Sequence, residues 1–282
     1  MSGAQRGIGE AERPAYAPDL YRSVARARRV ARFTDIGDAQ LNFFRREGYL
    51  VVDRAFAPEC IAAAINAVCD LIDGKNPDFR GVQLEAAHRG SDLKGAALHC
   101  AVRKLMGFVD CDDRFPALAH DPALRGVLSQ LMDDEPVLFQ EMALLKPPGG
   151  REKPWHQDCA YFNVHPDTTV IGVWIALEPA TLENGCLHVM PGTHREGPTP
   201  HFRRRDWQIC DTDVDTGRDV AVPLELGGCL LWHGLTHHGS PSNQSGQSRR
   251  ALQLHYQPAS TSEISKEERE ALYGGEVLGA EC

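Results

Sequence analysis

The second half of the chain is a series of short apolar or β-branched runs separated by turn-forming residues. The runs cover residues 136–145, 168–177, 186–190, 220–224, 229–232 and 251–256. Glycine- and proline-rich turns separate them, for example Pro147-Pro148-Gly149-Gly150 and Asn184-Gly185. Short strands that alternate with such turns are typical of a sandwich, a jelly roll or a barrel. This pattern restricts the body of the chain to a mainly β fold.

Helical patterns precede the strands, each marked by a capping residue, an early proline or a terminal glycine. Predicted helices begin with Asp38 as a cap, with Pro58 in the first turn, and with Asp121 as a cap. Residues 49–52 read as a further strand, whereas residues 74–100 show no clear period and are expected to form a loop.

We expect three parts: a basic N-terminal arm (1–37), the body with its N-terminal helices (38–260), and a helical tail (261–282). In the tail, Ser265 and Glu268 have the spacing of a capping box, which predicts a helix. The arm carries a basic run that is compatible with a helix: Arg22, Arg26, Arg28, Arg29 and Arg32.

The composition is that of an ordinary globular protein, with 42% hydrophobic and 24% charged residues. A formal net charge of −9 argues against non-specific binding of nucleic acid, which needs a basic surface. No apolar run approaches the roughly 20 residues of a membrane-spanning helix, and no apolar segment follows a basic N-terminus. We therefore expect a cytoplasmic protein without a membrane partner. Nine cysteines, an odd number without CxxC spacing, predict reduced thiols. No pattern indicates an oligomeric state.

Candidate metal ligands lie in two segments about eighty residues apart. In an extended strand, His156 and Asp158 point to the same face, so one imidazole and one carboxylate can converge. The second segment offers His233, His237 and His238. Two histidines and one carboxylate, with the opposite positions open, suit a non-heme Fe(II) oxygenase.

We choose His238 as the third ligand because of the residues that follow it. Gly239 allows close backbone approach, Ser240 offers a hydroxyl, and Arg249 offers a planar fork for a carboxylate. An iron oxygenase needs a two-electron co-reductant, and the remote carboxylate of 2-oxoglutarate needs such an arginine. Arg249 and Arg250 are both candidates, and strand alternation lets only one of them face inward.

A set of motifs occurs in order along residues 39–259 and resembles the phytanoyl-CoA dioxygenase family of Fe(II)/2-oxoglutarate oxygenases. The motifs are Arg103-Lys104; Met142 with Lys146-Pro147-Pro148; His156-Gln157-Asp158 with Tyr161-Phe162; Val173-Trp174-Ile175-Ala176-Leu177; Glu183-Asn184-Gly185-Cys186-Leu187 leading to Pro191-Gly192-Thr193-His194; and His238-Gly239-Ser240 with Asn243, Ser245 and Arg249. The resemblance implies a double-stranded β-helix (jelly roll, cupin-like) with flanking helices.

The resemblance also implies the roles of individual residues. His156, Asp158 and His238 are the expected iron ligands, and Arg249, with Ser240 beside it, is the expected partner of the 2-oxoglutarate carboxylate. The other implied co-substrate contacts are Lys104, Met142, Gln157 and Trp174. From residue type alone, Met142 and Trp174 read as core and Lys104 as a solvated charge. On an ideal strand, Gln157 faces away from both neighbouring ligands.

The expected reaction uses O₂ and 2-oxoglutarate to hydroxylate an unactivated C–H bond of a small organic substrate, acyl-CoA-like or another metabolite, with release of succinate and CO₂. Asp158 favours hydroxylation because a small residue there would leave room for a halide ion. Desaturation, ring formation and epimerisation remain open, as does the role of residues 203–205. Two alternatives are a cupin-like Zn²⁺ hydrolase or isomerase and a non-catalytic binding protein.

Overall fold

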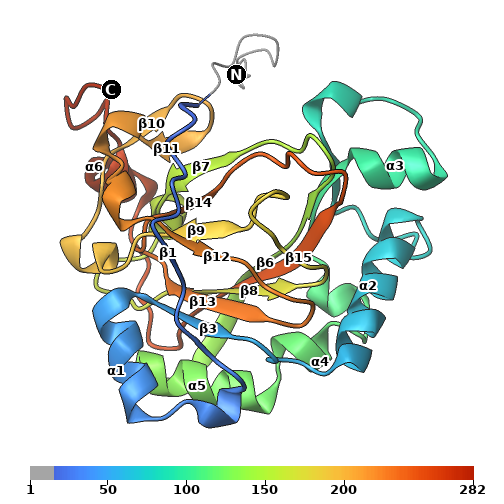
Figure 1. Ribbon diagram of the computed structural model, residues 1–282, viewed down its shortest axis with the longest axis horizontal. Coiled ribbons are helices and arrows are strands. Elements are labelled where there is room, and N and C mark those ends of the chain that lie inside the picture. Colours follow the sequence, from blue (N-terminus) through green and yellow to red (C-terminus); the bar gives the residue numbers. More distant parts are fainter. Residues whose placement is uncertain (1–15) are drawn as a thin grey trace.

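Two mixed β-sheets form the body of the protein, and the computed structural model describes residues 16–282 (Figure 1). The larger sheet has the strand order β2-β3-β13-β8-β15-β6-β5-β4. Its strands are β2 (Arg29–Val30), β3 (Tyr49–Val52), β4 (Val82–Leu84), β5 (Val102–Met106), β6 (Pro136–Lys146), β8 (Ile171–Ala176), β13 (Cys229–His233) and β15 (Arg249–Pro258). The smaller sheet has the order β1-β12-β9-β14-β7. Its strands are β1 (Ala25–Arg26), β7 (Lys153–His156), β9 (Leu187–Val189), β12 (Val220–Val222) and β14 (His238–Ser240).

Helices cover the outer face of the larger sheet (Figure 1). They are α1 (Asp38–Glu47), α2 (Pro58–Ile72), α4 (Pro116–Ala119) and α5 (Pro122–Met132). The mostly exposed α3 (Gly95–Ala101) lies beyond α2 (Figure 1), where His99 forms a hydrogen bond with Asp73. On the other side of the molecule, α6 (Lys266–Tyr273) lies near a hairpin of β10 (His201–Arg203) and β11 (Trp207–Ile209) (Figure 1). Among the described helices, none has the length and apolar character needed to cross a membrane.

Strand β13 shows how the sequence separates the two sides of the larger sheet. Cys229 and Leu231 pack in the apolar cluster shared with the helices, whereas Leu230 and Trp232 pack in the cluster between the two sheets. Successive side chains of a strand point to opposite faces, so one continuous apolar run covers both faces of a buried strand. Two mixed sheets of short strands agree with the mainly β fold that the turn-separated runs predict, and with the double-stranded β-helix that the family resemblance implies.

The structure confirms most of the capping residues and terminal glycines that the sequence predicts at the helix ends. Asp121 accepts hydrogen bonds from the backbone N–H groups of Ala123 and Leu124 at the start of α5, and Ser265 and Glu268 form the capping box of α6. Gly48 ends α1 with φ of +78°, a conformation that favours glycine. The N-cap of α1 is Gly37 rather than Asp38, which is the first helical residue.

Two segments in the first hundred residues differ from their sequence patterns. The basic run, although compatible with a helix, contains β1 and β2, which pair in parallel with β12 and β3. Residues 74–100 are not all loop: β4 pairs with β5, and α3 begins at Gly95. These strands are short, with exposed or half-buried residues, so their pairing depends on neighbouring sheet edges and leaves no periodic pattern.

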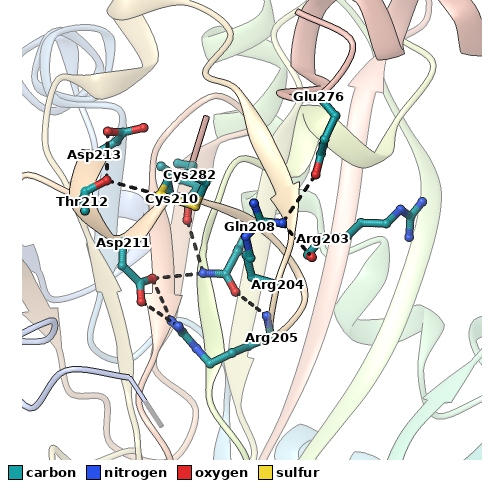
Figure 2. Close-up of a disulfide and its surroundings, with 11 residues drawn as sticks. Arg203, Arg204, Arg205, Gln208, Cys210, Asp211, Thr212, Asp213, Glu276 and Cys282 are labelled. Carbon is teal, nitrogen blue, oxygen red and sulfur yellow. Dashed lines mark hydrogen bonds and ion pairs between the residues drawn. A yellow bond between two sulfur atoms is a disulfide. The ribbon is translucent and has the colours of Figure 1, made fainter. Parts of the chain in front are cut away.

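The prediction that all cysteines are reduced is also wrong. Cys210, just after β11, forms a disulfide with Cys282 at the C-terminus (Figure 2). The other seven cysteines are free thiols. The disulfide joins residues 72 positions apart and fixes the tail beside the β10–β11 hairpin, where the backbone N–H of Gly275 also donates to the carbonyl of His201.

Candidate active site

Three of the predicted ligands converge between the sheets. His156 ends β7, His238 begins β14, and the two residues are directly opposed in the antiparallel pair. Asp158 begins a short 3₁₀ turn two residues after the end of β7, and its Oδ1 atom lies 3.5 Å from Nε2 of each histidine. The three ligand atoms lie within 4.8 Å of one another, and all three residues are buried. Two imidazoles and one carboxylate at this spacing fit an iron ion with open positions on the opposite side.

Backbone carbonyl groups fix the orientation of both imidazoles. Nδ1 of His156 donates to the carbonyl of Pro154 at 2.8 Å, and Nδ1 of His238 donates to that of Thr236 at 3.0 Å. A carbonyl oxygen only accepts, so Nδ1 carries the proton and Nε2 presents its lone pair. Burial lowers the pKa of both imidazoles, that of His238 to about 3, which keeps them neutral and able to bind a metal ion.

The far oxygen of the Asp158 carboxylate is held by two side chains. Oδ2 accepts the indole N–H of Trp232 at 2.8 Å and the Nε2–H of His255 at 3.0 Å. Burial alone would raise the pKa of Asp158, but the surrounding imidazoles lower it well below its usual value. The carboxylate is therefore ionised, with Oδ1 directed at the two histidines.

A cavity of about 750 Å³ opens beside the three ligands. This volume is in the range of small-molecule sites. Its exposed end includes Arg89 and Gly90, and its buried end includes Lys146 and Arg249. Further lining residues include Lys104, Met106, Gln140, Met142, Leu144, Tyr161, Phe162, Trp174, Ser240 and Gln253. The walls combine apolar side chains with a few polar groups, as ligand-binding cavities usually do.

The two neighbouring arginines of β15 face opposite sides of the sheet. Arg249 is 3% exposed, lines the cavity and donates to the carbonyl of Gly185. Burial lowers its pKa only to about 10, so the guanidinium stays charged at neutral pH. Arg250 instead pairs with Glu178 at 2.6 Å. Alternation along the strand thus leaves Arg249 as the arginine inside the cavity.

Four other expected co-substrate residues line the same cavity: Lys104, Met142, Trp174 and Ser240. Trp174 is fully buried beneath the guanidinium of Arg249, and its indole N–H has no hydrogen-bond partner among the described residues. A buried donor without a partner is uncommon, and here it borders a cavity that can hold a polar ligand. Burial and the charge of Lys153 lower the pKa of half-buried Lys104.

The structure does not support the expected contact between Gln157 and the co-substrate. Its side chain is fully buried and donates to the carbonyls of Gly197 and Leu235, while its Oε1 accepts from the backbone N–H of Thr199. It does not line the cavity. The backbone at Gln157 is extended, with φ of −109° and ψ of 135°, so the side chain points away from those of His156 and Asp158. The Gln157 side chain therefore connects the segments at Gly197, Thr199 and Leu235 through hydrogen bonds, on the side of the backbone away from the metal ligands.

The other two histidines of the downstream segment lie outside the cavity. His237 forms a hydrogen bond with the hydroxyl of Thr199, on the opposite face of the strand from His238. His233 packs against the ring of His194, at a centroid distance of 5.2 Å. Of His233, His237 and His238, only His238 therefore lies within reach of the same metal position as His156 and Asp158.

Residues 203–205 lie outside the cavity as well. Arg205 forms ion pairs with Glu152 and Asp211, and Arg204 lies 3.6 Å from Glu276 (Figure 2). Arg203 lies over the ring of Trp207. The adjacent Asp206 does line the cavity, where it pairs with Lys153 at 3.0 Å. The hairpin thus contributes one partner, Asp206, of an ion pair in the cavity wall, and β7 contributes the other, Lys153.

Sequence reasoning missed Trp232, His255 and Lys146. Strand alternation was the available signal for His255, because residues 249, 251, 253 and 255 share one face of β15. Trp232 lies two residues after Leu230 on the inward face of β13. Lys146 is the direct cross-strand neighbour of Arg249. Of the three, His255 is found by extending the alternation from Arg249, whereas Trp232 and Lys146 depend on how the strands pair.

A jelly roll with two imidazoles and one carboxylate beside an open cavity defines the class of non-heme iron oxygenases. The model of the phytanoyl-CoA dioxygenase (PhyH) family matches residues 44–251, and the chain belongs to this family. It is 34% identical over 259 residues to phytanoyl-CoA dioxygenase domain-containing protein 1 of Danio rerio, covering 77% of this chain and 89% of the relative. It is 30% identical over 267 residues to phytanoyl-CoA dioxygenase 1 of Oryza sativa subsp. japonica, covering 82% and 92%.

The fold also resembles solved structures. EvdO2 from Micromonospora carbonacea var. aurantiaca, complexed with 2-oxoglutarate, superimposes with a TM-score of 0.66 at 26% identity, over 84% of this chain and 97% of that one. The family resemblance inferred from the motifs is thus confirmed. The chain is an iron- and 2-oxoglutarate-dependent oxygenase of the double-stranded β-helix class.

Proposed function

We propose that this oxygenase hydroxylates an unactivated C–H bond of a small organic substrate, with His156, Asp158 and His238 holding Fe(II). The observation that carries the assignment is the convergence of Nε2, Oδ1 and Nε2 of these residues within 4.8 Å at the cavity wall. When bound, iron with 2-oxoglutarate and O₂ supplies the oxidising power, and succinate and CO₂ are released.

The chain's own residues hold and orient the reactants. Arg249 is the proposed partner of the remote 2-oxoglutarate carboxylate, with the Ser240 hydroxyl and the indole N–H of Trp174, which has no partner among residues 16–282, as further donors. Tyr161, Phe162 and Gln253 form the wall beside the ligands and limit the entry of water. No side chain has to act as a general base, because the metal and the co-substrate carry out the oxidation.

The presence of Asp158 supports hydroxylation over halogenation, because its carboxylate occupies a position that a halide would need. Desaturation, ring closure and epimerisation are distinguished by their products. Candidate substrates would be incubated with the enzyme under ¹⁸O₂: hydroxylation adds one labelled oxygen atom to the product, and the other three outcomes add none. A substrate converted without gaining label would contradict the proposed reaction.

Succinate formation tests the assignment of the three ligands. Protein purified without oxygen would be incubated with Fe(II), ascorbate, O₂ and 2-oxoglutarate in the absence of a prime substrate. We expect slow succinate release that is lost in Asp158→Ala. Equal succinate release by the wild type and Asp158→Ala would contradict the ligand assignment. A Zn²⁺-dependent hydrolase or isomerase would be indifferent to 2-oxoglutarate.

A further inference from the structure

The buried end of the cavity contains the amino group of Lys146 beside the guanidinium of Arg249. Burial, together with the charge of Arg249, lowers the pKa of Lys146 well below its usual value. Lys146 ends β6 and is the direct cross-strand partner of Arg249 on β15, so both side chains project from the same face. Lys146 is 6% exposed and Arg249 is 3% exposed, and both line the cavity. Among the described residues, neither forms an ion pair with a carboxylate. Buried charges in proteins are usually paired, so an anionic ligand between these two groups would pair with Arg249 and favour the protonated form of Lys146.

The contacts of Lys146 connect it to the proposed co-substrate site. Its ammonium donates to the hydroxyl oxygen of Ser240 at 2.7 Å and to the carbonyl of Pro241 at 2.6 Å. Because the Ser240 oxygen accepts from Lys146, the hydroxyl proton is free to donate to another acceptor. An ammonium group held against this oxygen therefore orients the hydroxyl as a donor toward the cavity.

The turn that contains Gly185 packs against the two basic side chains at this end of the cavity. Arg249 donates to the carbonyl of Gly185, and a Cβ atom at Gly185 would lie 3.2 Å from Nζ of Lys146 and would clash with the carbonyl of Pro241. The φ angle of Gly185 is +79°, which also favours glycine. The turn thus excludes other side chains from the space beside both basic groups.

We propose that Lys146 is a second cation for the remote carboxylate of 2-oxoglutarate, acting beside Arg249 and through the oriented hydroxyl of Ser240. This inference rests on the proposed roles of Arg249 and Ser240. It makes Lys146 a positioning residue for the co-substrate. The alternative role for the same contacts is structural: Lys146 would only tie the end of β6 to the segment after β14.

A co-substrate analogue separates these two roles. 2-Oxopentanoate has the same 2-oxo acid head as 2-oxoglutarate but carries a methyl group in place of the remote carboxylate. Dissociation constants of both compounds would be measured by calorimetry on Fe(II)-loaded protein without O₂, for the wild type and Lys146→Met. We expect 2-oxoglutarate to bind about 10- to 100-fold more weakly to the variant, because a charge-assisted contact is lost, whereas 2-oxopentanoate is little affected.

The structural role predicts that the substitution weakens the binding of both compounds by the same factor. An unchanged ratio of the two dissociation constants between the wild type and the variant would overturn the proposal. Lys146→Gln serves if the Met variant does not fold, since its amide can still donate to Pro241 without a charge. A double variant with Ser240→Ala adds a further check: if Lys146 acts through this hydroxyl, the losses of 2-oxoglutarate affinity are less than additive. Failure of the wild type to bind either compound would instead contradict the proposed function.

Discussion

Trp232 donates its indole N–H to Oδ2 of Asp158 at 2.8 Å, while Oδ1 of the same carboxylate faces His156 and His238. The tryptophan therefore sets which oxygen is presented to a metal ion, together with His255. Groups that orient metal ligands in this way commonly change metal affinity by about 10- to 100-fold when removed. Trp232 and His255 thus belong to the functional site although neither reaches the metal position.

Trp232→Phe should weaken Fe(II) binding by about 10- to 100-fold, because the Asp158 carboxylate loses one of its two fixed donors. The measurement is a titration of the metal-free protein with Fe(II) in the absence of O₂. Trp155→Phe is a matched control: Trp155 is equally buried, but its indole donates to the carbonyl of Leu20. Similar losses in both variants would mean that lost packing, rather than the contact with Asp158, governs metal affinity.

Arg249→Ala should weaken 2-oxoglutarate binding by about 10- to 100-fold, because a buried carboxylate would lose a charged donor. The adjacent Arg250→Ala should leave this affinity near the wild-type value, since Arg250 pairs with Glu178 on the other face of the sheet. Calorimetric titration of both variants checks the prediction. If Arg250→Ala gave the larger loss, the assignment of the inward-facing arginine would be reversed.

Strands β3, β8, β9, β12 and β13 were predictable because nearly all of their residues are buried on both faces. An apolar run such as residues 229–232 is dictated by its surroundings, and the glycine- and proline-rich turns mark where each run ends. β1, β2 and β4 were not predictable. Their residues are exposed or half-buried, so they carry no hydrophobic pattern, and they exist because β12, β3 and β5 offer edges to pair with.

The ligands were predictable for a related reason. Alternation in an extended segment places His156 and Asp158 on one face, and the same rule correctly turns Gln157 away from them. Contacts between segments far apart in the chain were harder to predict from the sequence. The hydrogen bond from Trp232 to Asp158 and the disulfide between Cys210 and Cys282 depend on the tertiary structure. The spacing of these residues in the sequence does not reveal either contact.

The disulfide should stabilise the folded protein. Cys282→Ser should lower the free energy of unfolding by roughly 2–4 kcal/mol, because the unfolded chain is no longer restricted by a closed loop. Thermal unfolding of the oxidised wild type and of the variant measures this difference, and the wild type in excess dithiothreitol should behave like the variant. Cys100→Ser, at an exposed free cysteine, is the matched control. Identical unfolding of oxidised wild type and Cys282→Ser would contradict the prediction.

His188 and Asp219 form a buried ion pair whose contribution to stability should depend on pH. Nδ1 of His188 lies 2.7 Å from Oδ1 of Asp219, and their side chains are 2% and 0% exposed. Burial alone would lower the pKa of His188, but the hydrogen bond and charge of Asp219 raise it to about 9, with a smaller contribution from the Cys186 thiol. The ring of Tyr21 also packs against the imidazole.

Because the pKa of His188 is higher in the folded protein than the ordinary value of 6.5, folding is favoured while the imidazole is protonated. This contribution is fully present below about pH 6.5 and is lost as the pH rises through about 9. His188→Gln should therefore be most destabilised relative to the wild type at pH 6, and the difference should shrink by pH 10. Chemical unfolding of both proteins across this range measures it, and a difference that grows with pH would contradict the protonated pair.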